Sequence, residues 1–275
     1  TGATAGPTKM WNETYAAYAQ ATYRLSEQFA ITAGLRYTED KTRSVFSNGR
    51  VRFTPADNWA SNTYECGFPG HPDAGPNPVL VTLRYPNTRA NRDTLCFNDR
   101  SKKSSAPTWT INLEYKPNSD ILGYAKWSRG YRQGGIVPAT GLPEFVAYDA
   151  EKIDAFELGA KTSWGGTVRG RFNVAAFYNK FGAQQIQAGI NSPDLAVQTT
   201  MILSGQSELY GLEADLMLEP ADWLQFEAAY SYNHTKLTKI SYPDLSAFGL
   251  IVRQLPVGGP LPLAVPHAFN ATATF

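Results

Sequence analysis

Few side chains in this sequence have the types and spacing that catalysis or metal binding requires. The three histidines are too far apart for a metal-site spacing: His71, His234 and His267. No phosphate-binding loop, G-x-S-x-G or H-E-x-x-H motif is present. Glu213 and Asp215 share one strand face, as paired catalytic carboxylates would, but a salt bridge to Arg171 is the favoured interpretation. We therefore predict no enzyme activity, no cofactor and no metal site.

The two cysteines, Cys66 and Cys96, lie in one polar segment rich in proline and glycine. Neither belongs to an apolar strand, where a buried free thiol would be expected. One disulfide between them is predicted, which implies an oxidising compartment, and two unrelated free thiols are the alternative.

Composition restricts the class of protein. The chain has 275 residues, a formal net charge of +1, 43% hydrophobic residues and 13% aromatic residues. Near-neutral charge argues against a nucleic-acid partner, which would show as a basic excess. No apolar run approaches the roughly 20 residues that a membrane helix needs, so any membrane crossing must use strands. No signal peptide is visible at the start of the sequence.

The main pattern is an alternation of apolar and polar residues with a period of two, which is typical of β-strands. We predict about nine strands and no amphipathic helix. The alternating segments are 11–24, 29–38, 108–116, 121–132, 156–164, 168–179, 210–218, 224–233 and 269–275.

The connections between these strands alternate in length. Tight turns are predicted at 26–28, 118–120, 165–167 and 220–222, and long segments at 44–107, 133–152, 183–203 and 236–266. In an up-and-down meander this alternation puts every tight turn at one end and every long loop at the other. That asymmetry is typical of outer-membrane barrels, whereas soluble Greek-key folds mix loop lengths.

The apolar face carries aromatic residues at both ends of a strand and smaller residues between them. Tyr15 and Tyr23 frame three alanines, and Trp109 and Tyr115 frame Ile and Leu. A soluble core places its largest residues centrally, whereas amphipathic rings prefer the two headgroup zones of a membrane. We therefore favour an all-β, antiparallel up-and-down transmembrane β-barrel over the alternative, a soluble β domain.

The polar face carries charges of both signs, which suits the wall of a polar lumen. We predict that five of these residues form a charge ladder along the lumen: Lys161, Arg169, Arg171, Glu213 and Asp215. Ordinary solvated surface is the alternative interpretation.

Several motifs resemble TonB-dependent outer-membrane receptors. The stretch YAQATYRL (18–25) through GLRYTEDK (34–41) resembles a barrel hairpin of that family. GYAKWSRGYRQGG (123–135) resembles a strand that ends in a Gly-Tyr-Arg motif and enters a surface loop. Residues 151–161, YGLEAD (210–215) and PHAFN (266–270) resemble later strands. The resemblance covers nearly all of the chain except the long loops.

The resemblance implies an outer-membrane barrel of about 22 strands, plugged by an N-terminal domain and coupled to TonB. Residues 1–275 would form part of that barrel, with a long extracellular loop at about 44–107. The sequence shows neither a plug nor a TonB-binding segment, so we expect a longer receptor that reaches TonB through a missing N-terminal region. The implied function is energy-coupled uptake of a scarce nutrient, with a ferric siderophore as the first candidate and haem, cobalamin or glycans as alternatives.

Candidate ligand contacts lie at the loop end of the predicted barrel. Arg129, Tyr131 and Arg132 stand at a loop base, where arginine offers planar donors to an anionic chelate. Pairing with lumen carboxylates or with lipopolysaccharide phosphates is the alternative for the arginines. Trp59 and Tyr64 belong to the long loop that contains the cysteines.

A passive outer-membrane porin without a plug is the competing function, because it has the same architecture. An outer-membrane hydrolase is a more distant alternative. Partners expected in either case are outer-membrane lipid and lipopolysaccharide.

Overall fold

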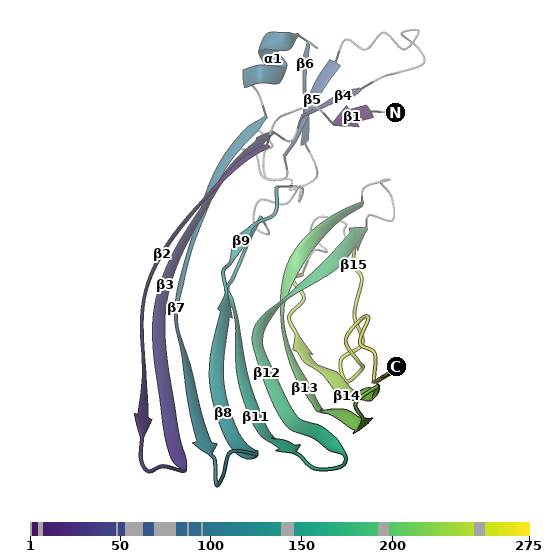
Figure 1. Cartoon of the computed structure of the whole chain (residues 1–275). Coiled ribbons are helices and arrows are strands. Elements are labelled where there is room, and N and C mark those ends of the chain that lie inside the picture. Colours follow the sequence, from purple (N-terminus) through teal and green to yellow (C-terminus); the bar gives the residue numbers. More distant parts are fainter. Residues whose placement is uncertain are drawn as a thin grey trace.

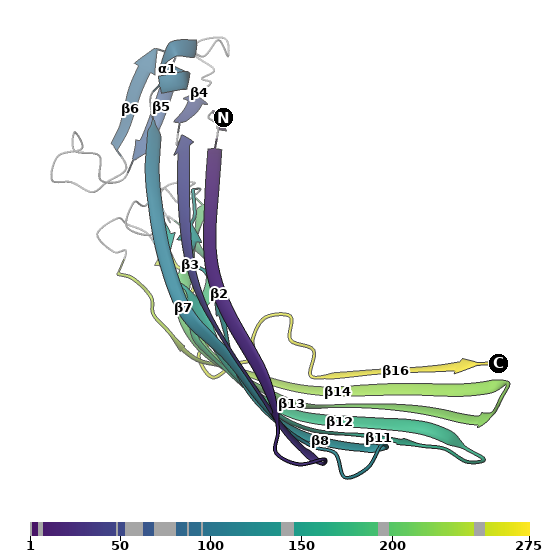
Figure 2. The same cartoon turned by 60° about the vertical axis from the view of Figure 1, so that its left-hand side comes forward.

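The computed structural model describes residues 2–4, 8–47, 49–52, 63–68, 81–86, 88–94, 96–138, 146–191, 198–244 and 251–275. One large antiparallel sheet dominates, and it curves strongly (Figures 1 and 2). Its strands are paired in the order β16-β14-β13-β12-β11-β8-β7-β3-β2. In chain order, the bounds are β2 Thr8–Arg24, β3 Phe29–Ser47, β7 Phe97–Tyr115, β8 Ile121–Arg132, β11 Glu151–Trp164, β12 Arg169–Asn191, β13 Gln198–Ala221, β14 Leu224–Ile240 and β16 His267–Thr274.

The nine strands of this path confirm the predicted number and the up-and-down order, because each long strand pairs with the next along the chain. The tight turns all lie at one end of the sheet and the long connections at the other (Figure 1). In the β7–β8 turn, Asn118 Oδ1 accepts hydrogen bonds from the backbone N–H of Asp120 and Ile121. Gly166, in the β11–β12 turn, has a φ of 113°, which glycine adopts without a steric cost.

Small elements lie at the loop end. β1 Gly2–Thr4, β4 Gly49–Arg52, β5 Thr63–Phe68 and β6 Val81–Pro86 form a four-stranded sheet, and α1 spans Arg89–Thr94. β9 Gly135–Ile136 pairs with β10 Ala147–Tyr148, and β15 Ile251–Val252 pairs with β12. No helix in the described residues is both long and apolar enough to cross a membrane.

Several strands are longer than predicted, so the bounds predicted for two long segments, 44–107 and 183–203, are wrong. β3 and β7 pair continuously as far as Ser47 and Phe97, whereas the sequence suggested a loop from 44 to 107. β12 and β13 likewise pair out to Asn191 and Gln198, inside the predicted 183–203 loop. These extensions pass beyond the apolar belt, where the outer face turns polar and the alternation disappears. In one of them, the exposed Arg43 guanidinium bonds Asp99 and lowers the pKa of that carboxyl.

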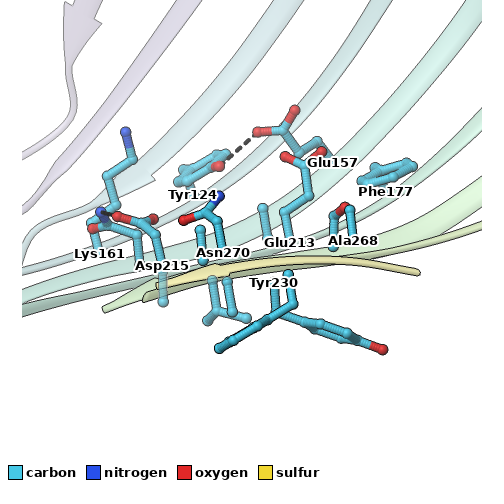
Figure 3. A pocket seen from close by; sticks show the side chains of 17 residues that line it. Tyr124, Glu157, Lys161, Phe177, Glu213, Asp215, Tyr230, Ala268 and Asn270 are labelled. Carbon is cyan, nitrogen blue, oxygen red and sulfur yellow. Dashed lines mark hydrogen bonds between the residues drawn. The ribbon is translucent and has the colours of Figure 1, made fainter. Parts of the chain in front are cut away.

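The sheet has two chemically distinct faces. Cross-strand partners share a face and successive residues alternate, so the pairing assigns every strand position to one side. The inner face, toward which the sheet curves, includes Tyr124, Glu157 and Asp215 (Figure 3). The outer face carries large exposed apolar residues, among them Leu35, Leu158 and Phe269. Apolar side chains therefore point outward, as the prediction of a membrane barrel requires.

An aromatic row crosses the outer face on the loop side. Trp127, Phe156, Tyr178, Tyr210 and His234 are successive cross-strand partners from β8 to β14. The rings of Trp127 and Phe156 stack 6.0 Å apart, and those of Tyr210 and His234 4.8 Å apart. On the turn side, Phe29 stacks on Tyr115 at 4.5 Å. The eight residue-to-residue steps from Phe156 to Trp164 give roughly 20 Å of tilted strand, close to the height of a barrel's apolar band.

The buried apolar clusters lie at the loop end of the sheet. Phe46, Ile136 and Val146 form one cluster, with exposed fractions of 1–5%. A second contains Ala188, Met201 and Leu203, and partly buried side chains of the β14–β15 region pack against it. The strand extensions are therefore held by ordinary burial, whereas the belt offers its apolar side chains outward.

Gly211 provides a test of how tightly the inner wall is packed. A Cβ at this position would lie 2.0 Å from the Tyr232 carbonyl oxygen and 2.7 Å from the Phe177 ring. We expect Gly211→Val to destabilise the folded barrel by about 1–3 kcal/mol through overpacking. The measurement is the fraction of full-length protein that migrates as the folded, heat-modifiable form across a urea series. Gly182→Val is the control, since nothing lies within 4 Å of its Cβ position; equal losses in both variants would contradict the prediction.

Candidate functional site

The inner face holds a polar hollow of about 420 Å³ at its centre. Tyr124, Glu157, Lys161, Glu213 and Asp215 project into it from β8, β11 and β13 (Figure 3). Tyr230 points away on the opposite side of the ribbon, as the alternation of strand faces requires. The hollow is therefore part of the polar wall, separated from the apolar belt by one layer of backbone.

Hydrogen bonds fix the polar groups of this hollow. The Tyr124 hydroxyl donates to Glu157 Oε1 at 2.6 Å, and Asn173 Nδ2 donates to Asp215 Oδ1 at 2.8 Å. Lys161 Nζ lies 6.0 Å from the centre of the Tyr124 ring. Gly159 makes room for that ring, because a Cβ there would approach it to 2.5 Å. The arrangement positions hydrogen-bonding groups without a nucleophile–base pair.

The register places all five residues of the predicted charge ladder on the inner face. Lys161, Glu213 and Asp215 line the hollow, whereas Arg169 lies at the turn end and bonds Glu219 and Asp222, both at 2.9 Å. The predicted salt bridge from Glu213 and Asp215 to Arg171 is wrong. Arg171 pairs across the sheet with Met217, and Asn173 is the residue opposite Asp215. Asn173 therefore takes the contact with Asp215.

Two of the predicted ligand contacts, Arg129 and Arg132, are already paired with carboxylates. Arg129 donates to both oxygens of Asp154, at 2.7 and 2.5 Å, and its guanidinium lies 4.3 Å from the centre of the Trp109 ring. Arg132 pairs with Glu151. The bidentate pair of Arg129 fixes the orientation of its guanidinium, and both pairs neutralise the charge of the arginine.

The structure describes the remaining predicted contacts, Tyr131, Tyr64 and Trp59, to different extents. Tyr131 lines a hollow of about 370 Å³ at the loop end, together with Asp40. Tyr64 lies in β5, opposite Val51 and Tyr85. Trp59 lies outside the described residues. Arg129 lines the same hollow as Tyr131, whereas Arg132 and Tyr64 are not among its lining residues.

The structure describes the side chain of only one cysteine of the predicted disulfide, Cys96. Cys66 pairs in β5 with Gly49 and Leu83, but its side chain lies outside the described part. Cys96 is buried just before β7, and none of the described cysteines is a free thiol. Pairing of the two cysteines stays a prediction.

A network that the sequence did not reveal ties the β8–β11 connection to β12. Glu151 is 8% exposed and accepts a hydrogen bond from the Gln185 backbone N–H at 2.7 Å, in addition to Arg132. The Gln185 side-chain amide donates to the carbonyl oxygens of Gln133 and Asp149, at 2.8 and 3.0 Å. Both ends of the connection are thereby fastened at one point.

The same connection folds onto the inner face of β3 and β7. Ile136 and Val146 pack against Phe46, and the Gly134 N–H donates to Ser104 Oγ at 3.2 Å. Lys102 Nζ contacts Asp149 Oδ1 at 2.5 Å. β9 and β10 thus cover part of the inner face at its loop end.

No group of three or more His, Cys, Asp or Glu side chains in the described ranges is arranged to hold a metal ion. His234 stacks on Tyr210, and His267 Nδ1 lies 2.8 Å from the Tyr230 hydroxyl, both on the outer face. The described histidines therefore belong to the aromatic belt.

A wall with a polar inner face, an apolar outer face and an aromatic row is the wall of an outer-membrane barrel. The family model for the β-barrel of TonB dependent receptor-like proteins matches residues 8–275. The chain belongs to this family, whose members are outer-membrane transporters rather than enzymes. The predicted family, fold class and outer-membrane location are thereby confirmed.

Solved structures support the same fold. The ferric yersiniabactin uptake receptor FyuA from Yersinia pestis matches 98% of this chain at 16% identity, with a TM-score of 0.63. The siderophore receptor PiuA from Acinetobacter baumannii matches 98% at 15% identity and 0.57. The Serratia marcescens hemophore receptor HasR, in complex with HasA and heme, matches 97% at 14% and 0.50. The chain spans 32% of FyuA, 32% of PiuA and 49% of HasR, and a search of curated proteins found no match.

The Gln185 network yields a prediction about local opening. In Gln185→Leu, the carbonyl oxygens of Gln133 and Asp149 lose their shared donor, so we expect amides in 133–138 and 146–150 to exchange faster with deuterium. A tenfold increase corresponds to about 1.4 kcal/mol, the net value of one to two hydrogen bonds. Gln187→Leu is the matched control on the same strand. Unchanged exchange in Gln185→Leu would show that the network does not hold the connection.

Proposed function

We propose that this chain is part of the barrel wall of a receptor that takes up a ferric siderophore across the outer membrane with energy delivered through TonB. The observation that carries the proposal is the family match over 8–275 together with the polar inner wall. FyuA is a ferric yersiniabactin uptake receptor and PiuA is a siderophore receptor, which supports iron chelates as cargo. HasR is a hemophore receptor whose structure contains heme, so haem is the second candidate for the cargo.

In this proposal the loop end captures the solute outside the cell. The four-stranded sheet, α1 and the rest of the connection between β3 and β7 form the extracellular part, and Trp59, Tyr64 and Tyr131 contribute contact surface there. TonB acts through a region of the receptor outside this chain. Lipopolysaccharide and other outer-membrane lipids surround the apolar belt, whose aromatic rows suit the headgroup zones.

The test uses the full-length, detergent-folded receptor and a panel of ferric siderophores, haem and oligosaccharides. Saturable binding of a ferric siderophore, a closed pore in planar bilayers and uptake that stops in TonB-depleted cells are expected. Steady open conductance without saturable binding would contradict the proposed receptor function and indicate a passive porin. Saturable binding of haem alone would support the receptor function but show that its cargo is haem rather than a ferric siderophore.

We also propose that Cys66 and Cys96 form one disulfide in the extracellular part. Intact-mass analysis of the oxidised full-length protein is expected to show no thiol open to alkylation under denaturing conditions, and two after reduction. Cys66→Ser is expected to leave Cys96 open to alkylation without changing the heat-modifiable folding of the barrel, because the bond lies beyond the belt. Two alkylated thiols in the unreduced wild type would contradict the pairing.

A further inference from the structure

The inner wall is divided into two halves of opposite charge. Along β2, β3, β7 and β8 the inner face carries six basic side chains, Arg24, Arg36, Arg100, Lys102, Lys126 and Arg132, against two acidic ones, Asp40 and Glu114. Along β11 to β14 it carries three basic side chains, Lys161, Arg169 and Arg171, against six acidic ones, Glu151, Glu157, Glu213, Asp215, Glu219 and Glu227. A charged solute inside the lumen is therefore drawn to one side of this wall.

Most cations of the basic half already face a carboxylate or lie away from the membrane-spanning centre. Lys102 pairs with Asp149 and Arg132 with Glu151. Lys126 stands directly opposite Glu157. The other two lie away from the centre, Arg24 at the turn end of β2 and Arg100 in the strand extension.

Arg36 differs from these cations. Its cross-strand partners are Tyr18 and Thr108, so no carboxylate stands beside it in the register. Its described hydrogen bond runs from Nε to Thr38 Oγ1 at 3.0 Å, which leaves the outer edge of the guanidinium with donors to offer. Asp40 lies four residues further along β3, about 13 Å away along the strand, and accepts a hydrogen bond from Thr14 at 2.7 Å.

Open space adjoins Arg36 on both sides along the wall. A hollow of about 300 Å³ extends toward the centre and is lined by Tyr18, Gln20 and Thr110. A second, of about 370 Å³, extends toward the loop end and is lined by Thr38, Tyr131 and Gln133, with Asp40 at its far end. Arg36, Thr108 and Arg129 line both hollows, and Arg129 is already paired with Asp154. Tyr18 is 77% exposed on the inner face.

We propose that Arg36 is a specificity-determining residue that binds an anionic oxygen group of the imported solute. A guanidinium offers planar, paired donors to carboxylate, catecholate or phosphate oxygens, and the hydrogen bond described for Arg36 is to a hydroxyl rather than to a carboxylate. Tyr18 and Tyr131 add aromatic surface on either side. The solute class is therefore an anionic chelate rather than a neutral or cationic one. This inference rests on the proposed function and specifies that the imported solute carries negative charge.

The experiment measures binding to the full-length receptor of an anionic ferric catecholate, ferric citrate and a neutral ferric trihydroxamate. Wild type is expected to bind an anionic chelate more tightly than the neutral one. Arg36→Gln is expected to weaken anionic binding about ten- to a hundredfold, the loss of one or two charge-assisted hydrogen bonds, with part of the affinity restored in Arg36→Lys. The affinity is also expected to fall less steeply with salt in Arg36→Gln.

Arg24→Gln is the matched control, because it removes the same charge from the same face of the wall at the turn end. Heat-modifiable migration and the recovery in Arg36→Lys separate a binding loss from misfolding. Unchanged anionic affinity in folded Arg36→Gln, or wild-type preference for the neutral chelate, would overturn this inference while the receptor function stands. Absence of saturable binding to every chelate, with open conductance, would instead overturn the proposed function, and this inference with it.

Discussion

The structure depends on one constraint: a backbone inside lipid must satisfy its hydrogen bonds without water, since each unpaired group costs several kcal/mol. The continuous antiparallel pairing from β2 to β16 meets that constraint for the strands inside the sheet. Once the pairing register is fixed, each side chain belongs to one face. A one-residue slip would place Glu157 and Asp215 among Phe156 and Leu216 in the belt, so the register is strongly specified.

The two faces then follow different rules. The outer face must be apolar through the belt, and its aromatic row lies where the strands leave it. The inner face is free to carry charge, because water in a lumen and cross-strand partners solvate it. Tyr124 with Glu157 and Asn173 with Asp215 show such partners. The fold therefore tolerates charge on the inner face, whereas the same charge on the outer face of the belt would destabilise the barrel.

The alternation of apolar and polar residues predicts where the strands lie and which face each residue occupies. It does not predict which residues become cross-strand partners, because that depends on the pairing register. The strands, the ends that carry turns and loops, and the faces of Lys161 and Asp215 followed from a period of two. The extension of β3 to Ser47 did not, because a strand beyond the belt has two polar faces and no alternation. The partners of Arg129 and Arg132 were also hidden, since Asp154 and Glu151 lie beyond a connection whose length does not fix the pairing.

Irregular backbone accounts for the part that is hardest to predict. Ala183 has a φ of 53°, and the β12–β13 register shifts between Phe181 and Gln184. This bulge leaves Gln185 bonded through its backbone N–H to Glu151 and through its side chain to Gln133 and Asp149. A bulge re-aims side chains at the rim of a barrel, and nothing in the alternation of 169–191 marks its position. The centre of the belt is thus built from regular pairing, whereas the loop end is shaped where that regularity is broken, beside β9 and β10.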